Sequence, residues 1–354
     1  MALSNPRRFV RRAQNEVLVP SGRLAGAARE LYCRLVPNRS PLSRGNPDRL
    51  LLVYDSLCNP VTFDFLHYIY YADWLRGELG KAHLDVMLVI RKNVSASREE
   101  HYMAAIGADN IDWRVANIIM PLCRQFAPAG RVYVLDHEEA FEVVKGYRHV
   151  HPQGYGYASP KSAECRLDAP GMRFRPTLIP SETARSVIDA YFPAEDARRL
   201  VTVTLRSYAY LAKRNSNIAA WAQFAHDLDP LKYRTVFIPD ASPRGVATLE
   251  ELAGCEVFAP ACWNLELRTA IYERAWMNMG VAGGPLAISG ILENAITVMI
   301  YDPASFPADY LDSFYRTTGV VPGEGPAFYS PRCRFYHGSD NTETIRKAFD
   351  EYAS

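Results

Sequence analysis

Short apolar runs alternate with longer amphipathic stretches along most of the chain. The short runs are rich in β-branched residues and predict strands over 50–54, 84–90, 131–135, 201–206, 235–238, 256–258, 277–282 and 297–301. Apolar residues at helical spacing predict helices over 62–79, 98–106, 112–126, 181–192, 218–228, 248–253, 265–275, 286–294 and 342–352. Strands that alternate with helices indicate mostly parallel sheets joined by right-handed crossovers.

Two irregular stretches, 146–180 and 302–334, interrupt this alternation. The first is rich in Gly, Pro, His and Tyr, as expected of a linker or a functional connection. A chain of 354 residues is also longer than one hydrophobic core usually grows. We therefore predict two α/β domains, divided as a basic N-terminal extension (1–47), an N-terminal domain with its linker (48–180), a C-terminal domain (181–335) and a C-terminal helix (336–354).

The N-terminal segment carries most of the charge asymmetry. Ten arginines precede Leu50, against only Glu16, Glu30 and Asp48. A helix predicted over 21–36 is amphipathic and suited to peripheral contact with an anionic membrane surface. The alternative, which we favour, is an extension that packs on its own domain. The formal net charge of the whole chain is +1, which gives no general attraction to nucleic acid, so we expect no nucleic-acid partner.

Composition narrows the class of protein. Hydrophobic residues make up 48% of the chain and charged residues 22%, which is typical of a globular protein. No stretch approaches the roughly 18 to 20 apolar residues that a membrane helix needs. The seven cysteines are scattered without a C-x-x-C pair, H-E-x-x-H is absent, and no D-x-D stands at the end of a predicted strand. We expect a cytoplasmic protein with no metal site, either free or peripheral to the inner face of the membrane.

The stretch VTVTLRSYAYLAKRNSN, residues 201–217, holds a strand, a basic loop and a helix start in succession. Arg206 stands at the carboxyl end of the strand, where open α/β sheets place their ligands. Lys213 and Arg214 follow, and Asn215, Ser216 or Asn217 is suited to cap the next helix. This arrangement favours a phosphate-bearing ligand. The alternative, a solvated basic loop, is equally compatible with these residues alone.

A second strand runs directly into Gly283, Gly284 and Pro285. Glycine allows a ligand to approach the backbone, and proline suits the first turn of a helix. Glycines in such turns often serve geometry alone. Paired with the basic loop of the same predicted sheet, however, this turn favours a diphosphate held at two points.

These two stretches carry a resemblance. The pair of Rossmann-like halves, with VTVTLR opening the second and VAGGPLAISGILENAITVMIY closing it, resembles a GT-B glycosyltransferase of the heptosyltransferase-like kind. The family's helix commonly carries a histidine where this chain has Ala287 or Ile288, and an acidic or hydroxyl residue where Gly283 and Gly284 stand. The resemblance implies two Rossmann-like domains facing across a cleft. It also implies a nucleotide-sugar donor in the C-terminal half, a glycan or lipid-linked acceptor in the N-terminal half, and no cofactor or obligatory metal.

The resemblance implies that basic side chains neutralise the donor's diphosphate and that the backbone of the glycine turn approaches it. The residues implied in donor binding are Arg206, Lys213, Arg214, Asn215, Asn264, Glu266, Gly283, Gly284 and Pro285. Asn264 and Glu266 begin a predicted helix and are expected to contact ribose or sugar hydroxyls. For Glu266 we favour the simpler interpretation, an acid that stabilises the first turn of its helix.

An inverting transferase also needs a base for the acceptor hydroxyl. Asp55 and Asp64 flank the first predicted strand-to-helix loop and are the catalytic candidates. Asp64 is also suited to decorate the first turn of its helix, which we favour. His149 and His151 fall in the predicted linker.

Two other functions stay open at this stage. One is a GT-B-like protein that binds nucleotide or glycan without catalysis, favoured by the missing histidine. The other is a GT-B-like sugar-nucleotide epimerase.

Overall fold

The structure is a computed structural model that describes residues 47–91, 110–155, 163, 165–241 and 250–353. The basic segment 1–46 and the helix predicted over 98–106 lie outside these residues. The chain groups into two units with interleaved segments. The first unit comprises Met1–Val61, His67–Glu100 and Pro128–Cys165, and the second Thr62–Leu66, His101–Ala127 and Arg166–Ser354. The domain limits drawn from the sequence stay predictions, because this grouping does not establish which parts fold alone.

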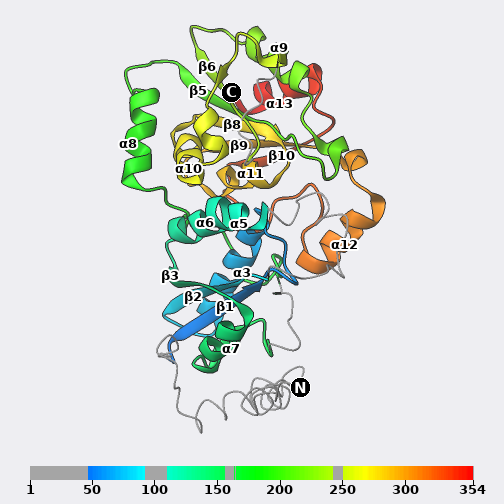
Figure 1. The fold of residues 1–354 in the computed structure, drawn as a ribbon. Coiled ribbons are helices and arrows are strands. Elements are labelled where there is room, and N and C mark those ends of the chain that lie inside the picture. Colours follow the sequence, from blue (N-terminus) through cyan, green and yellow to red (C-terminus); the bar gives the residue numbers. More distant parts are fainter. Residues whose placement is uncertain (1–46, 92–109, 156–162, 164, 242–249, 354) are drawn as a thin grey trace, which may run out of the picture. The chain divides into compact units, whose positions relative to one another are not determined.

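The first unit contains a four-stranded sheet with the strand order β3-β2-β1-β4. Figure 1 labels β3, β2 and β1 of this sheet. Its strands are β1 (Arg49–Asp55), β2 (His83–Val89), β3 (Ala129–Leu135) and β4 (His149–His151), and all neighbours are parallel. The continuous apolar run of β1 reflects a central strand, because its residues after Arg49 are all buried. Helix α3 (Phe65–Glu78) follows β1, as predicted.

Two elements of this unit were not predicted. Helix α7 (His137–Lys145) packs Ala140, Val143 and Val144 against Leu51 and Val53 of β1. Strand β4 lies inside the stretch predicted to be irregular, and it pairs with residues 50–52 of β1. His149 and His151 are therefore strand residues and not part of a linker, and the placement of His151 in a linker is wrong because its side chain is buried in the sheet.

The second unit contains a six-stranded parallel sheet with the order β10-β9-β8-β5-β6-β7. Its strands are β5 (Arg199–Thr204), β6 (Tyr233–Ile238), β7 (Glu256–Val257), β8 (Met277–Val281), β9 (Ile296–Tyr301) and β10 (Cys333–His337). Counted along the chain, this is the 3-2-1-4-5-6 order of the Rossmann fold. The predicted α/β class with two parallel sheets is thus confirmed.

Alternation along β5 separates the two faces of this sheet. Val201 and Val203 join a buried cluster with Phe224 of α9 (Ile218–Asp227) and Phe349 of α13 (Thr342–Ala353). Thr204 points to the other face, where its hydroxyl lies 2.7 Å from the Tyr272 hydroxyl of α10 (Leu265–Arg274). Helix α8 (Glu182–Tyr191) packs beside α10 (Figure 1). The period-2 pattern of VTVTLR therefore arises because alternate residues of β5 face helices on opposite sides of the sheet.

The helix predicted over 112–126 is confirmed as one helical run, made of α5 (Ile111–Arg114), a π-helical turn (Val115–Ile119) and α6 (Met120–Gln125). Other elements differ from the prediction. The tail predicted to be irregular contains β10 and α12 (Ala308–Thr318). The helix predicted over 248–253 is described only as a 3₁₀ turn, Glu250–Leu252.

The helix predicted over 286–294 does not form. In its place are one α-helical turn, α11 (Gly284–Ala287), and a 3₁₀ turn, Ser289–Ile291. The Ser289 hydroxyl donates to the Leu286 carbonyl at 2.7 Å and so competes with continuation of the helix. Gly290 lies in a crowded place, where an added Cβ would come within 3.2 Å of the Cys333 thiol and the Met299 methyl.

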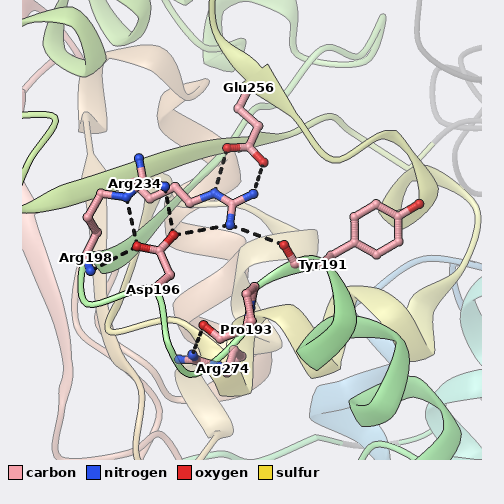
Figure 2. Close-up of polar contacts among 7 residues, drawn as sticks. All are labelled: Tyr191, Pro193, Asp196, Arg198, Arg234, Glu256 and Arg274. Atoms are coloured by element: carbon pink, nitrogen blue, oxygen red, sulfur yellow. Dashed lines mark hydrogen bonds and ion pairs between the residues drawn. The ribbon is translucent and has the colours of Figure 1, made fainter.

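A charged cluster connects the amino-terminal ends of β5, β6 and β7. Figure 2 shows Arg234 of β6 between Glu256 of β7 and Asp196, which precedes β5. The Arg234 guanidinium donates two hydrogen bonds to Glu256, at 2.9 and 2.6 Å, and one to the Tyr191 carbonyl at 3.2 Å. Hydrogen bonds from Arg198 hold the pKa of Asp196 well below its usual range. The cluster fixes the connection from α8 into β5.

Candidate anion-binding site

The strand order of the second unit reverses between β5 and β8, which is where Rossmann-type sheets bind their ligands. Two connections leave the carboxyl ends of these strands. One is the loop 205–216 after β5, and the other is the turn that follows Val281 of β8. Both stretches singled out in the sequence therefore meet at one edge of one sheet.

Arg206 is fixed inside its own loop. Its Nη1 atom donates to the Leu211 carbonyl at 3.1 Å and to Asn215 Oδ1 at 2.5 Å, and its Nη2 atom donates to the Tyr210 carbonyl at 2.5 Å. The Ser216 N–H donates to the Arg206 carbonyl at 2.9 Å, and the Ser216 hydroxyl accepts from the Arg206 N–H at 2.9 Å. The guanidinium is thus held by neutral oxygens, which leave its charge uncompensated.

Asn215 has an organising role in this loop. Its side chain accepts from the Tyr208 N–H and donates to the Tyr208 carbonyl, both at 3.0 Å. Leu211 adopts a left-handed conformation with φ of 52°, the one non-glycine residue with positive φ in the described chain. A leucine in this region is strained, and such strain concentrates at functional loops. The predicted contact of Asn215 with a donor stays a prediction, because the structure shows Asn215 holding the loop and Arg206.

Arg214 comes from the same loop and reaches the second connection. Its Nη2 atom donates to the Ala282 carbonyl at 2.9 Å, directly before Gly283. Its guanidinium lies 4.1 Å above the centre of the Phe306 ring, a cation–π contact. Burial lowers the pKa of Arg214 from its ordinary value. Lys213, next to it, is exposed.

The two arginines act on each other. Burial, and after it the charge of Arg214, lowers the pKa of Arg206 to about 10. Within the described residues both guanidinium groups donate to neutral oxygens and form no ion pair with a carboxylate, and the charge of Asp240 partly offsets the lowering of the Arg206 pKa. Two positive charges that interact and are partly desolvated favour the binding of an anion with at least two negative charges.

The glycine turn has two distinct roles. Gly283 is extended, with φ of −168° and ψ of 164°, and an added Cβ would lie 3.8 Å from Cδ of Arg206. An added Cβ on Gly284 would instead come within 2.7 Å of the Phe63 Cβ. Gly283 therefore stands beside Arg206, whereas Gly284 allows the segment 62–66 to pack closely. Pro285, the second residue of α11, is buried.

Helix termini contribute less than predicted. Because α11 is a single turn, it offers no sizeable dipole to an anion. Helix α9 is capped by Asn217, whose Oδ1 accepts from the Ala220 N–H at 3.2 Å. The Asp340 carboxylate accepts from the Asn217 N–H at 2.7 Å and so already compensates that helix terminus. At this edge the two arginines, and not the helix termini, are therefore the groups suited to an anion.

Two predicted donor ligands are engaged locally. Asn264 caps α10, where its Oδ1 accepts from the Leu267 N–H at 3.1 Å. Glu266 accepts a hydrogen bond of 2.6 Å from the Ser181 hydroxyl, which begins α8. The structure thus shows local roles for both, and their contact with a sugar or ribose stays a prediction.

The two candidate bases differ sharply. Asp55 is fully buried in the first unit, where it receives Arg91 in a bidentate pair at 2.8 and 2.6 Å. It also accepts from the Tyr155 hydroxyl at 2.7 Å and from the Leu57 N–H at 2.9 Å. Burial opposes the charge of Arg91, but the hydrogen bonds and charges of Asp55 and Tyr155 together outweigh it and raise the Arg91 pKa. With both oxygens occupied, Asp55 is placed as a structural ion pair.

Asp64 is exposed and belongs to the second unit. It accepts a hydrogen bond of 3.0 Å from the Thr62 hydroxyl, and its charge contributes to the pKa of Arg214. The same short segment places Phe63 against Gly284. Of the two acids, therefore, Asp64 is the one that the structure brings to the arginine pair.

Two residues of this site were missed in the sequence. Asp240 follows β6 directly, accepts from the Ser207 N–H at 3.0 Å, and has a pKa that burial raises. An acid directly after the second strand of a Rossmann sheet was the available signal. Arg114 of α5 donates to the Tyr208 hydroxyl at 2.9 Å and supports the loop from outside, and no local pattern marks it.

The described ranges contain no group of three or more His, Cys, Asp or Glu side chains placed to hold a metal ion, and metal independence stays a prediction. Among the described helices, none has the length and apolar character needed to cross a membrane.

No family model and no curated protein matches this chain. Several solved structures are similar at low identity. The ADP-heptose LPS heptosyltransferase II of E. coli is 14% identical, with 86% of this chain and 98% of that chain covered and a TM-score of 0.48. A glycosyl transferase family 9 protein from Veillonella parvula is 12% identical over 86% and 96% of the chains, with a TM-score of 0.45. The E. coli heptosyltransferase WaaC with ADP is 11% identical over 86% and 98%, with a TM-score of 0.38.

Proposed function

We propose that this chain is a glycosyltransferase that moves a sugar from a nucleotide-diphosphate donor to the hydroxyl of a glycan or lipid-linked acceptor, without an obligatory metal ion. One observation carries the proposal. Arg206 and Arg214 lie partly buried at the switch point of a Rossmann-type sheet, and neither has a carboxylate partner within the described residues. A diphosphate would neutralise both charges at once.

In the proposed reaction, the acceptor hydroxyl oxygen bonds to the anomeric carbon of the sugar. The bond between that carbon and the β-phosphate oxygen breaks, and its electron pair stays on the diphosphate. The hydroxyl proton passes to a base, for which we propose Asp64 because it is exposed and close enough to Arg214 to act on its pKa. Arg206 and Arg214 stabilise the charge that develops on the leaving group.

The sequence resemblance supports sugar transfer over other uses of a diphosphate. Its two motifs, VTVTLR and VAGGPLAISGILENAITVMIY, form β5 and the segment from β8 to β9. These strands frame the arginine pair.

A second candidate is a protein that binds a nucleotide sugar without transferring it. Two observations favour it. Asp55 is locked in an ion pair, and Ala287 and Ile288, where the family commonly carries a histidine, are both buried. A histidine at either position would point into the core.

Titration calorimetry with ADP, UDP, GDP and CDP tests the shared part of both candidates. We expect one of them to bind, and Arg206→Ala to weaken that binding by at least tenfold. Arg346→Ala is the matched control, because Arg346 is exposed on α13 and forms a surface ion pair with Asp350, four residues on. An unchanged affinity in folded Arg206→Ala would refute the site. Release of the diphosphate from a nucleotide sugar then separates the transferase from the binding protein.

A further inference from the structure

A cavity of about 40 Å³ opens at the carboxyl ends of β8 and β9, beside the arginine pair. Its volume accommodates about three water-sized groups. Its walls include Lys213 and Arg214 from the loop after β5, Tyr301, Asp302 and Phe306 from the end of β9 and the segment after it, and Asp340, which follows β10. The space is polar on most sides and continuous with Arg214.

Tyr301 lines this cavity and carries an unsatisfied hydroxyl group. The residue ends β9 and is 5% exposed, and its hydroxyl is buried without a hydrogen-bond partner in the described part of the chain. Contacts with Phe306 and His337, at ring-centre distances of 5.4 and 5.5 Å, hold the ring in place. Burial raises the pKa of Tyr301, and the charges of Arg214 and Asp302 also act on it, so the hydroxyl end lies near these two groups.

A buried hydroxyl without a partner costs stability. Its presence beside a space that holds a few atoms indicates that a ligand group completes it.

The charges around the cavity define the chemistry of that group. The carboxylates of Asp302 and Asp340 would repel a second anion in this cavity. The positive charges of Arg214 and Lys213 would repel a cation. Asp340 already accepts from the Trp221 indole N–H at 3.0 Å, so one of its oxygens is engaged. A neutral group that both donates and accepts hydrogen bonds fits all of these neighbours, and an alcohol is such a group.

We propose that this cavity, the Tyr301 cavity, binds a hydroxyl-bearing arm of the donor's sugar, such as a hydroxymethyl group or a vicinal diol. This proposal rests on the proposed function, because the arm extends from a diphosphate held at Arg206 and Arg214. Tyr301 and Arg214 donate to the sugar hydroxyls, and Asp302 accepts from them. Arg214 links the two parts of the site, since it also donates to the Ala282 carbonyl beside Gly283.

Tyr301→Phe tests this proposal by removing one oxygen atom that has no partner among the described residues. We expect the melting temperature to stay equal or to rise, because a buried unsatisfied group is lost. Calorimetry then compares each nucleoside diphosphate with its sugar conjugates, namely UDP-glucose, UDP-galactose, GDP-mannose and ADP-glucose. The variant is expected to keep the diphosphate affinity within about twofold and to bind the preferred nucleotide sugar about 5- to 30-fold more weakly. Tyr315→Phe, on the exposed face of α12, is the matched control.

The outcomes separate the two proposals. If Tyr301→Phe binds the nucleotide sugar as tightly as the unmodified protein, the Tyr301 cavity is refuted and the proposed function stands. An equal loss for the diphosphate and its sugar conjugate also refutes it, because the hydroxyl would then serve the phosphates. The Tyr301 cavity is also refuted if no nucleotide sugar binds more tightly than the corresponding nucleoside diphosphate. If the unmodified protein binds no diphosphate at all, the proposed function fails and the sugar subsite fails with it.

Discussion

Gly283 and Gly284 are adjacent, yet the structure predicts opposite consequences for a methyl group added to each. In Gly284→Ala, the new Cβ would lie 2.7 Å from the Phe63 Cβ, inside the 3.0 Å below which real Cβ contacts are essentially never found, and 3.2 Å from the Phe63 ring. In Gly283→Ala, the nearest atoms are the Val281 carbonyl oxygen at 3.6 Å and Arg206 Cδ at 3.8 Å, which are ordinary contacts.

The expected magnitudes follow from these distances. Overpacking of this kind costs about 1 to 3 kcal/mol, which for a unit of this size lowers the melting temperature by about 2 to 12 °C. Gly283→Ala should leave the free energy of unfolding within about 0.5 kcal/mol, because its extended backbone is open to any residue. Its methyl group would stand beside Arg206, however, and should weaken diphosphate binding about tenfold, or about 1.4 kcal/mol.

Thermal unfolding and calorimetry with the bound diphosphate measure both effects. Gly77→Ala is the control, because an added Cβ at Gly77 in α3 meets nothing within 4 Å. Full diphosphate affinity in Gly283→Ala would refute the approach of the ligand to this backbone. A Gly284→Ala variant that melts with the unmodified protein would show that the packing on Phe63 is not tight.

Three further predictions concern charge. Because the pKa of Arg206 is lowered to about 10, its charged form destabilises the folded state at every pH below about 10, and this cost falls only as the pH rises from about 10 towards 12.5. Arg206 therefore stays protonated between about pH 7 and 9, where calorimetry should give a constant diphosphate affinity; a steady fall over that range would contradict it. Asp55→Asn should lower the free energy of unfolding by about 3 kcal/mol in denaturant titrations because it breaks the buried pair with Arg91, whereas Asp64→Asn should keep its stability and lose turnover; the reverse pattern would exchange their roles. Arg234→Ala should lower the melting temperature, because the variant loses the ion pair with Glu256 and the cation–π contact with the Phe192 ring. An unchanged melting curve would show that this charged cluster does not stabilise the fold.

The sequence was sufficient where one residue pattern dominates. The strands β1, β5 and β9 are buried on both faces and stand out as apolar or β-branched runs. Strand β4 has three residues, and β10 reads CRFYH with a partly exposed pattern, so neither offers a clear period. Helix α12 lies in a stretch interrupted by Pro and Gly on both sides.

The candidate site shows the same limit. Arg206 and Gly283 were found because each follows a strand, and parallel strands deliver such residues to one edge. What a side chain contacts across the fold was not visible. Asp55 reads as an accessible acid after a strand, yet it is locked against Arg91, and the crowding of Gly284 depends on Phe63. The unsatisfied hydroxyl of Tyr301 also depends on the folded surroundings.

The interleaving of the two units has a consequence for the synthesis and the proteolysis of this protein. Residues 62–66 and 101–127 are synthesised early but belong with the segment that ends the chain. Phe63 thus emerges from the ribosome long before Gly284 exists, and this region must wait for a distant partner. A fragment that starts after residue 127 would lack part of its own scaffold, so a single proteolytic nick cannot release the second unit intact.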